Sequence, residues 1–202
     1  MNPFRVLVGL VALAGCAAPV AGTPSATGPV AAERNAAVLR AARAMLASGD
    51  CRAAEPKIVD APIRMDDPLL PGAARQLVLV EGCGGVGLLN FAVVPVPGRG
   101  ERVAPMFPGT TIAEPSLQRD GLRQAVLAVK AVAPDCDRIT VNDTRFDGPA
   151  GLGSRGGKVT RPWNETWVLG ACGRPVAVPM EFAPDQRGTL VRIDMRAVRP
   201  LG

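Results

Sequence analysis

The chain has 202 residues, a formal net charge of +5 and an apolar fraction of 48%, enough to build the core of one larger domain or two small ones. It contains no histidine, which removes the commonest general base, metal ligand and partner of a nucleophilic serine or cysteine. Its positive charges are scattered among acidic residues and aromatic residues make up only 3%, so we expect no nucleic-acid partner.

The first 15 residues have the three parts of an export signal. Arg5 supplies a positive charge, residues 6–14 form an apolar run too short to cross a bilayer, and small residues then precede Cys16. The run Leu13-Ala14-Gly15-Cys16 resembles the lipobox of bacterial lipoproteins. This resemblance implies cleavage before Cys16 and acylation of its sulfur and of the new amino terminus. Two or three acyl chains hold a protein stably at a membrane, and one does not.

Residues 16–31 are expected to form the lipidated end and a flexible tether. The stretch after Cys16 is rich in proline, alanine, glycine and threonine, and it shows no periodicity. Alanine rather than aspartate follows Cys16, and in the lipoprotein family this implies the outer membrane. We therefore expect a lipid-anchored protein of the cell envelope that faces the periplasm.

Two segments carry the pattern of amphipathic helices. In residues 33–46, Val38, Ala42 and Met45 share one face. Residues 117–133 form the second predicted helix, which Ser116 can cap and Pro134 ends. Its apolar stripe is predicted to consist of Leu122, Val126 and Val129. Each helix is expected to cover one face of a sheet, and binding at a membrane surface is the alternative.

Four cysteines remain besides Cys16, and in an exported protein an even number indicates two disulfides. Residues 76–83 can be aligned with residues 165–172, so that Cys83 lies over Cys172, and Cys51 then lies over Cys136. Each half thus runs helix, Cys, strand, loop, strand, Cys-Gly, strand. The repeat favours the pairs Cys51–Cys83 and Cys136–Cys172, and a redox role is the alternative, although no Cys-x-x-Cys occurs.

The predicted fold is α+β, with two tandem homologous units. Each unit is a helix packed on a three- or four-stranded antiparallel sheet with one disulfide. The predicted boundaries are 1–15 for the signal peptide, 16–31 for the tether, 32–112 for the first unit and 113–202 for the second. The competing explanation is chance similarity between two ordinary α/β stretches.

The order of elements, with Gly82-Cys83-Gly84 and Ala171-Cys172-Gly173, is similar to a recurring pattern in uncharacterised exported bacterial proteins. That resemblance covers most of residues 32–199 and brings no activity with it. The tandem plan with one disulfide per unit also resembles the architecture of the β-lactamase inhibitory proteins, whose cysteine spacing differs. A shared architecture does not imply a shared function.

Candidate chemical motifs are few. Residues 151–156 match the dinucleotide pattern G-x-G-x-x-G, but the βαβ unit that this pattern requires is not expected, so a hairpin loop is the preferred interpretation. Trp167 is expected in the core, whereas Trp163 and Arg155 are candidates for binding a partner. Asp66, Asp67, Asp135, Asp137 and Asp143 lack the spacing of a calcium loop and are expected in turns and caps.

We therefore expect a non-enzymatic envelope lipoprotein with a structural or partner-binding role. Its partners would be the bilayer, through Cys16, and an envelope protein. No catalytic residue, metal or cofactor is assigned. The alternative is a periplasmic inhibitor or small-ligand-binding module that acts through the loops around Arg155 and Trp163. A concave surface between the halves would favour that alternative, and a deep pocket with converging carboxylates or arginines would favour an enzyme.

Overall fold

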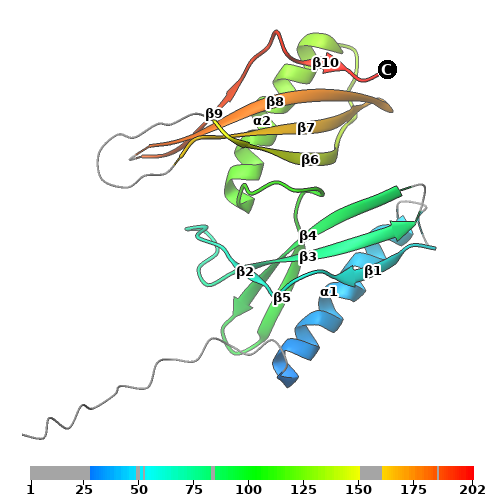
Figure 1. Ribbon diagram of the computed structural model, residues 1–202, viewed down its shortest axis with the longest axis vertical. Helices are drawn as coiled ribbons and strands as arrows, with labels where there is room; N and C mark the ends of the chain where they lie inside the picture. Colours follow the sequence, from blue (N-terminus) through cyan, green and yellow to red (C-terminus); the bar gives the residue numbers. More distant parts are fainter. Residues whose placement is uncertain (1–27, 49–50, 52, 83–84, 151–160, 186) are drawn as a thin grey trace, which may run out of the picture.

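The computed structural model describes residues 28–202 except residues 49–50, 52, 83–84, 151–160 and 186. Two helices and two antiparallel sheets form a mixed α+β fold, as predicted (Figure 1). Each sheet has five strands rather than three or four. The extra members are the two-residue strands β2 (Ile63–Arg64) and β10 (Arg199–Pro200), which are too short to leave a periodic signal in the sequence.

The first half contains one helix on one face of a sheet whose strand order is β1-β3-β4-β5, with β2 paired to β3. Its elements are α1 (Pro29–Ser48), β1 (Glu55–Ile58), β3 (Ala74–Gly82), β4 (Gly85–Val96) and β5 (Gly100–Pro105). Because α1 begins at Pro29, residues 29–31 are helical and not part of a tether, and proline is well tolerated in a first turn. The predicted face is confirmed, since Val38 and Ala42 are fully buried.

The second half repeats the arrangement of one helix over an antiparallel sheet, here in the order β10-β8-β7-β6 with β9 paired to β8. Its elements are α2 (Pro115–Val132), β6 (Ile139–Pro149), β7 (Trp163–Ala171), β8 (Arg174–Asp185) and β9 (Gly188–Ile193). The predicted disulfide Cys136–Cys172 is present, with 5.6 Å between the Cα atoms. Cys51 is also disulfide-bonded, but Cys83 and Cys16 lie outside the described residues, so the Cys51–Cys83 bond stays a prediction.

Helix α2 differs from its prediction at its start and in its buried stripe. Pro115 opens the helix after Glu114, so Ser116 is not the cap. The buried residues are Gln118, Gly121, Ala125, Ala128 and Val129, whereas Leu122 and Val126 lie at the margins. The stripe is rotated because Gly121 lets the helix approach the sheet closely. A Cβ on Gly121 would lie 2.9 Å from Cη2 of Trp167.

The segment between β5 and α2 runs between the two sheets and bonds to both of them. The amide of Gly109 donates to the Leu88 carbonyl of β4 at 2.8 Å, and the amide of Thr110 donates to the Thr144 carbonyl of β6 at 2.6 Å. Only glycine fits at position 109, where φ is +99° and a Cβ would lie 2.0 Å from the Thr144 carbonyl oxygen. The halves are therefore joined by backbone hydrogen bonds as well as by the chain.

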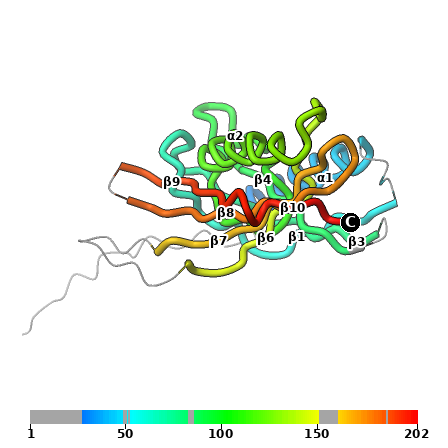
Figure 2. The backbone as a smooth tube through the Cα atoms, turned by 90° about the horizontal axis from the view of Figure 1, so that it is seen from above, coloured from blue at the N-terminus to red at the C-terminus, as the bar shows by residue number. Residues whose placement is uncertain are grey.

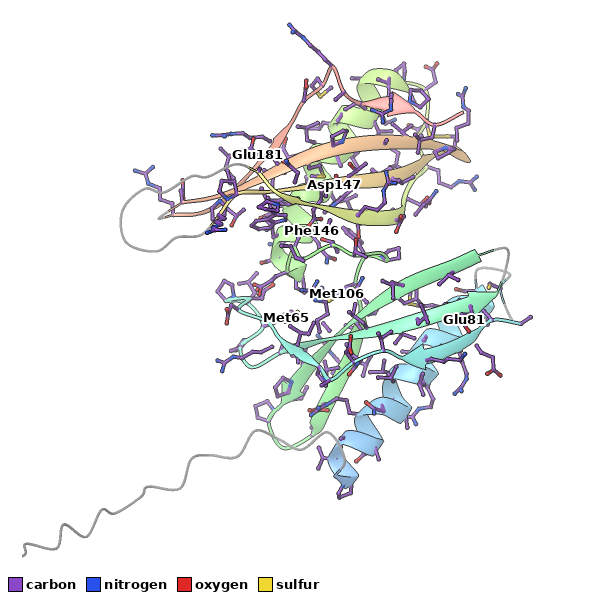
Figure 3. All side chains as sticks on the ribbon, in the orientation of Figure 1. Met65, Glu81, Met106, Phe146, Asp147 and Glu181 are labelled. Atoms are coloured by element: carbon purple, nitrogen blue, oxygen red, sulfur yellow. A yellow bond between two sulfur atoms is a disulfide. The ribbon has the colours of Figure 1, made fainter. Side chains whose placement is uncertain are left out.

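Viewed from above, α1 and α2 lie on the same side of the two sheets (Figure 2). In Figure 3, Met65 and Met106 lie at the end of the first half that faces the second, and Phe146 lies on the facing edge of the second half. Met65 and Met106 belong to a small buried cluster that closes this end of the first half. The described residues contain no helix that is both long and apolar enough to cross a membrane.

Candidate functional site

A group of interacting polar and aromatic side chains surrounds Glu165 on β7. Residues alternate between the two faces of a strand, so Trp163, Glu165 and Trp167 project from the same face. Glu165 is completely buried and accepts the indole N–H of Trp163 at 2.9 Å and that of Trp167 at 2.8 Å. The backbone amide of Ile112 donates a third hydrogen bond, at 3.0 Å. A buried carboxylate is tolerated only with such compensation.

Three aromatic contacts hold the two indoles in place. Trp163 stacks on Phe182 with 5.0 Å between the ring centroids, and Trp167 and Phe107 meet edge to face at 5.3 Å. The rings of Trp167 and Phe182 are tilted to each other at 6.1 Å. Trp167 is fully buried, as predicted. Trp163, the candidate for partner binding, is half-buried within this cluster, and Arg155 lies outside the described residues.

Arg75 of β3 approaches the cluster from the first half. One of its terminal nitrogens donates to the Thr111 carbonyl, whereas its Nε has no hydrogen-bond partner among the described residues. Burial lowers the pKa of Arg75, and the negative charges of Glu165 and Glu114 oppose that shift. We call the group formed by Arg75, Thr111, Ile112, Glu114 and Glu165 the junction.

Two aspartates of the first half lie beside the junction, at the start of α2. Asp67 is almost fully buried and accepts the amides of Leu69 at 2.9 Å and Ser116 at 2.8 Å. The amide of Asp66 donates to the carboxylate of Glu114. Burial raises the pKa of Glu114, the hydrogen bond from Asp66 lowers it, and the charges of Asp67 and Asp66 raise it further. The first turn of α2 is thus held by a loop of the first half.

This arrangement is suited to holding two halves together. The buried carboxylates of Glu165 and Asp67 both accept hydrogen bonds from distant parts of the chain, Glu165 from the Ile112 amide and Asp67 from the Ser116 amide. Gln118 adds a further link, because its side chain accepts from the Phe107 amide and donates to the Ala113 carbonyl. Three bonds join segments that are distant in the sequence, namely Arg75 to Thr111, Ile112 to Glu165 and Asp66 to Glu114.

The remaining candidate motifs lie apart from the junction. Asp137 pairs with Lys130 at 2.8 Å, which lowers the pKa of Asp137. Burial raises the pKa of Asp143, which lies on β6. Among the described residues, no three His, Cys, Asp or Glu side chains gather as a metal site would require. Residues 151–156 lie outside the described residues.

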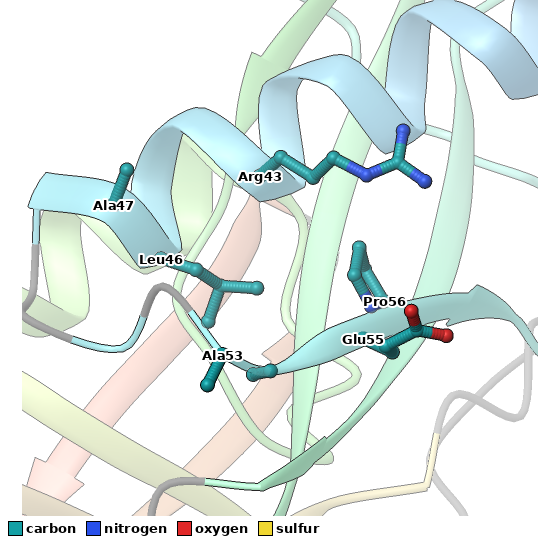
Figure 4. A pocket seen from close by; sticks show the side chains of 7 residues that line it. Arg43, Leu46, Ala47, Ala53, Glu55 and Pro56 are labelled. Carbon is teal, nitrogen blue, oxygen red and sulfur yellow. The ribbon is translucent and has the colours of Figure 1, made fainter.

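A surface cavity of about 420 Å³ lies between the end of α1 and the start of β1 (Figure 4). Its lining combines small apolar side chains with Arg43 and Glu55, which bring one positive and one negative charge to it. It is lined by Arg43, Leu46, Ala47, Ala53, Ala54, Glu55 and Pro56. The cavity lies beside the disulfide-bonded Cys51 and not between the two halves.

Sequence reasoning overlooked Glu165 and Arg75. The signal for Glu165 is the pattern Trp-x-Glu-x-Trp. Because side chains alternate between the two faces of a strand, this pattern places an acid on the same face as two tryptophans, where apolar residues are expected. A buried acid between two indoles predicts a hydrogen-bonded carboxylate. Arg75 carries no comparable signal, because its partner Thr111 is brought to it only by the path of the segment between the sheets.

No known protein family, curated protein or solved structure matches this chain significantly in sequence or fold.

Proposed function

We propose that the protein is a non-enzymatic lipoprotein of the bacterial cell envelope, held at the outer membrane by acyl chains on Cys16. The observation that carries this proposal is the run Leu13-Ala14-Gly15-Cys16 at the end of a short apolar segment. The Cys136–Cys172 disulfide supports export, because such bonds persist in oxidising compartments. Its role in the envelope is to bind another envelope protein or to serve as a structural component.

The junction supports the non-enzymatic part of the proposal. Its buried carboxylate, Glu165, is occupied by three donors, and Arg75 is covered by the segment that joins the halves. An acid or base in catalysis needs a free lone pair or proton near the substrate. The junction therefore acts to fix the relative position of the two halves.

The two halves are proposed to be tandem homologous units. Gln76 on β3 and Glu165 on β7 are both completely buried polar residues, and each lies at the same distance from the closing pair of its hairpin. Those closing pairs are Gly82 with Gly85 and Ala171 with Arg174. Each helix is followed by a disulfide-bonded cysteine, Cys51 or Cys136. A duplication accounts for these shared positions together.

The anchor is tested by expressing the full chain in a bacterium and comparing it with its Cys16→Ser variant. We expect the protein in the outer-membrane fraction, with an intact mass equal to the chain from Cys16 onward plus two or three acyl groups. The Cys16→Ser variant should be released into the soluble fraction. A chain that is soluble and unmodified contradicts the proposal. Crosslinking in the native envelope, with Cys16→Ser in parallel, then identifies any partner that depends on the anchor.

A small-ligand-binding role is the second candidate, and the cavity between α1 and β1 favours it. Its small apolar side chains and its two opposite charges suit a small molecule that is part apolar and part charged. The test is a thermal-shift screen against the protein and an Ala47→Trp variant, whose larger side chain fills the cavity. A compound that stabilises only the parent chain supports this role. A screen without such a compound contradicts it.

A further inference from the structure

Four edge strands of the two sheets, β1, β5, β6 and β10, have features that hinder pairing with another strand. On β1 the register with β3 turns Pro56 and Ile58 outward, and Pro56 has no N–H to donate. By the same reasoning Pro105 faces outward on β5 and Pro200 on β10. The edge of β6 is interrupted by two bulges and bonded to Thr110. Prolines, bulges and coverage are the usual protections of edge strands.

Strand β9 has none of these protections. Its hairpin with β8 closes at the pair Asp185 and Gly188, so Gly188, Leu190 and Arg192 bond to β8. Thr189, Val191 and Ile193 therefore turn their N–H and C=O groups away from β8. No other described strand pairs with β9, which lies at the outer edge of the second half in Figure 1. Leu190 is also 52% exposed, which is high for a large apolar residue.

The three outward residues are symmetric about Val191. We propose that β9 pairs antiparallel with β9 of a second copy of this chain, with the two-fold axis at Val191. Val191 then bonds to Val191 of the other copy, and Thr189 bonds to Ile193 at both ends. Among the described residues, the outward N–H and C=O groups of these three residues have no backbone partner, so the pairing forms six backbone hydrogen bonds. A two-fold interface of this kind closes on itself.

The charges at the ends of β9 are complementary in this register. Gly188 lies opposite Asp194 of the other copy, so the exposed Arg187 lies next to that aspartate, and symmetry repeats the contact. Arg192 lies opposite Leu190 of the other copy, and its charge is balanced within its own chain by Glu181 at 3.6 Å. The stem of Arg192 can therefore cover the exposed Leu190 without an unbalanced charge.

The register is tested with two variants that each add one cysteine, Leu190→Cys and Arg192→Cys, to the purified full chain in which Cys16→Ser removes the cysteine outside the predicted disulfides. Residues 190 and 192 of opposite copies form a close, non-hydrogen-bonded pair at about 4.5 Å between Cα atoms, within disulfide range. Like residues lie diagonally, about 7–8 Å apart, and cannot join in this register. Both side chains are exposed, so each variant should retain the thermal midpoint of the parent.

An equimolar mixture of the two variants, oxidised with copper phenanthroline, should shift most of the chain to a band of twice the mass. Each variant alone should stay at the monomer mass. Addition of Val191→Pro to both variants, which removes the central donor, should abolish the band. If the mixture of folded variants forms no dimer, the proposal is overturned. The edge of β9 would then be left to a strand of a different protein. Equal crosslinking of either variant alone also overturns it.

Discussion

The two halves share one arrangement, a helix over an antiparallel sheet, but they fill their cores differently. In the second half the fully buried side chains include Trp167, Phe182 and Leu169 in one cluster. In the first half Phe91 is the largest, and the buried apolar residues are divided between two clusters. Since burial of apolar area is the main stabilising term, the second half should be the more stable of the two. The same plan thus permits quite different stabilities.

Glu165 and Gln76, the buried polar residues at equivalent positions of the two halves, also differ in how fully they are hydrogen-bonded. Glu165 accepts three hydrogen bonds and links β7 to the segment between the sheets. The amide nitrogen of Gln76 donates to the Asp60 carbonyl at 2.6 Å, but its Oε1 has no partner among the described residues. The polar position in the second half therefore organises the junction, and that in the first half closes only a local loop.

The largest effect should follow from Glu165→Ala. It leaves two indole N–H groups and one amide buried without an acceptor, at about 1–3 kcal/mol each before relaxation, so we expect a loss of about 3–5 kcal/mol. Gln76→Ala removes one such bond and should cost about 1–2 kcal/mol. Urea unfolding measures both, and Glu181→Ala, at an exposed ion pair, is the control. Equal costs for Glu165→Ala and Gln76→Ala would refute the contrast between the halves.

The next effect concerns the disulfide of the second half. Its cysteines are separated by 36 residues, and in the chain-entropy model such a loop contributes about 3–4 kcal/mol. Cys136→Ser with Cys172→Ser should lower the urea midpoint accordingly. Peptide mapping without reduction should also find the predicted Cys51–Cys83 bond. A Cys51–Cys16 peptide would contradict both the repeat and the lipid anchor.

Gly121→Ala tests the close approach of α2 to the sheet. Alanine is the better helix former by about 1 kcal/mol, yet its Cβ would lie 2.9 Å from the fully buried Trp167. We expect a net destabilisation of about 1–2 kcal/mol, measured by thermal unfolding. Leu127→Ala, at a position of the same helix that is 66% exposed, should change the stability by less than about 0.5 kcal/mol. A stabilised Gly121→Ala variant would mean that the helix lies farther from the sheet.

In the first half, α1 is held to β5 by a bidentate ion pair. Arg34 donates to the two Glu101 carboxylate oxygens at 2.5 and 2.7 Å, and the hydrogen bond raises the pKa of Arg34. Glu101→Gln should cost about 1 kcal/mol at low ionic strength and less as salt is added. Urea unfolding at two salt concentrations measures this, and a cost independent of salt would exclude an electrostatic origin.

The smallest effect is the pH dependence of the junction. Burial raises the folded-state pKa of Glu114 above its unfolded value, so the folded state binds this proton more tightly. The contribution of Glu114 to stability is therefore most favourable below the unfolded pKa and is lost as the pH rises through the folded pKa. Glu114→Gln keeps the acceptor for the Asp66 amide without this titration. It should become relatively more stable than the parent between pH 4 and pH 7. The opposite trend would contradict the direction of the shift.

The regular elements could be predicted from the sequence, because apolar periodicity is a local property. The face of α1, the strands around Cys83 and Cys172 and the Cys136–Cys172 bond all followed from local pattern or from the repeat. The junction could not be predicted in this way. Arg75 meets Thr111, and Asp67 meets Ser116, only because Gly109 lets the chain pass between two sheets. Such contacts depend on topology, which periodicity does not encode.

The central claim is that the junction makes two unequal halves unfold as one unit. Both tryptophans lie in the second half, whereas the far-ultraviolet circular dichroism signal comes from both halves. Urea unfolding followed by the two signals should therefore give coincident midpoints. Glu165→Ala should separate the two midpoints. Separate midpoints in the unmodified protein would show that the halves unfold independently, and that would contradict the account.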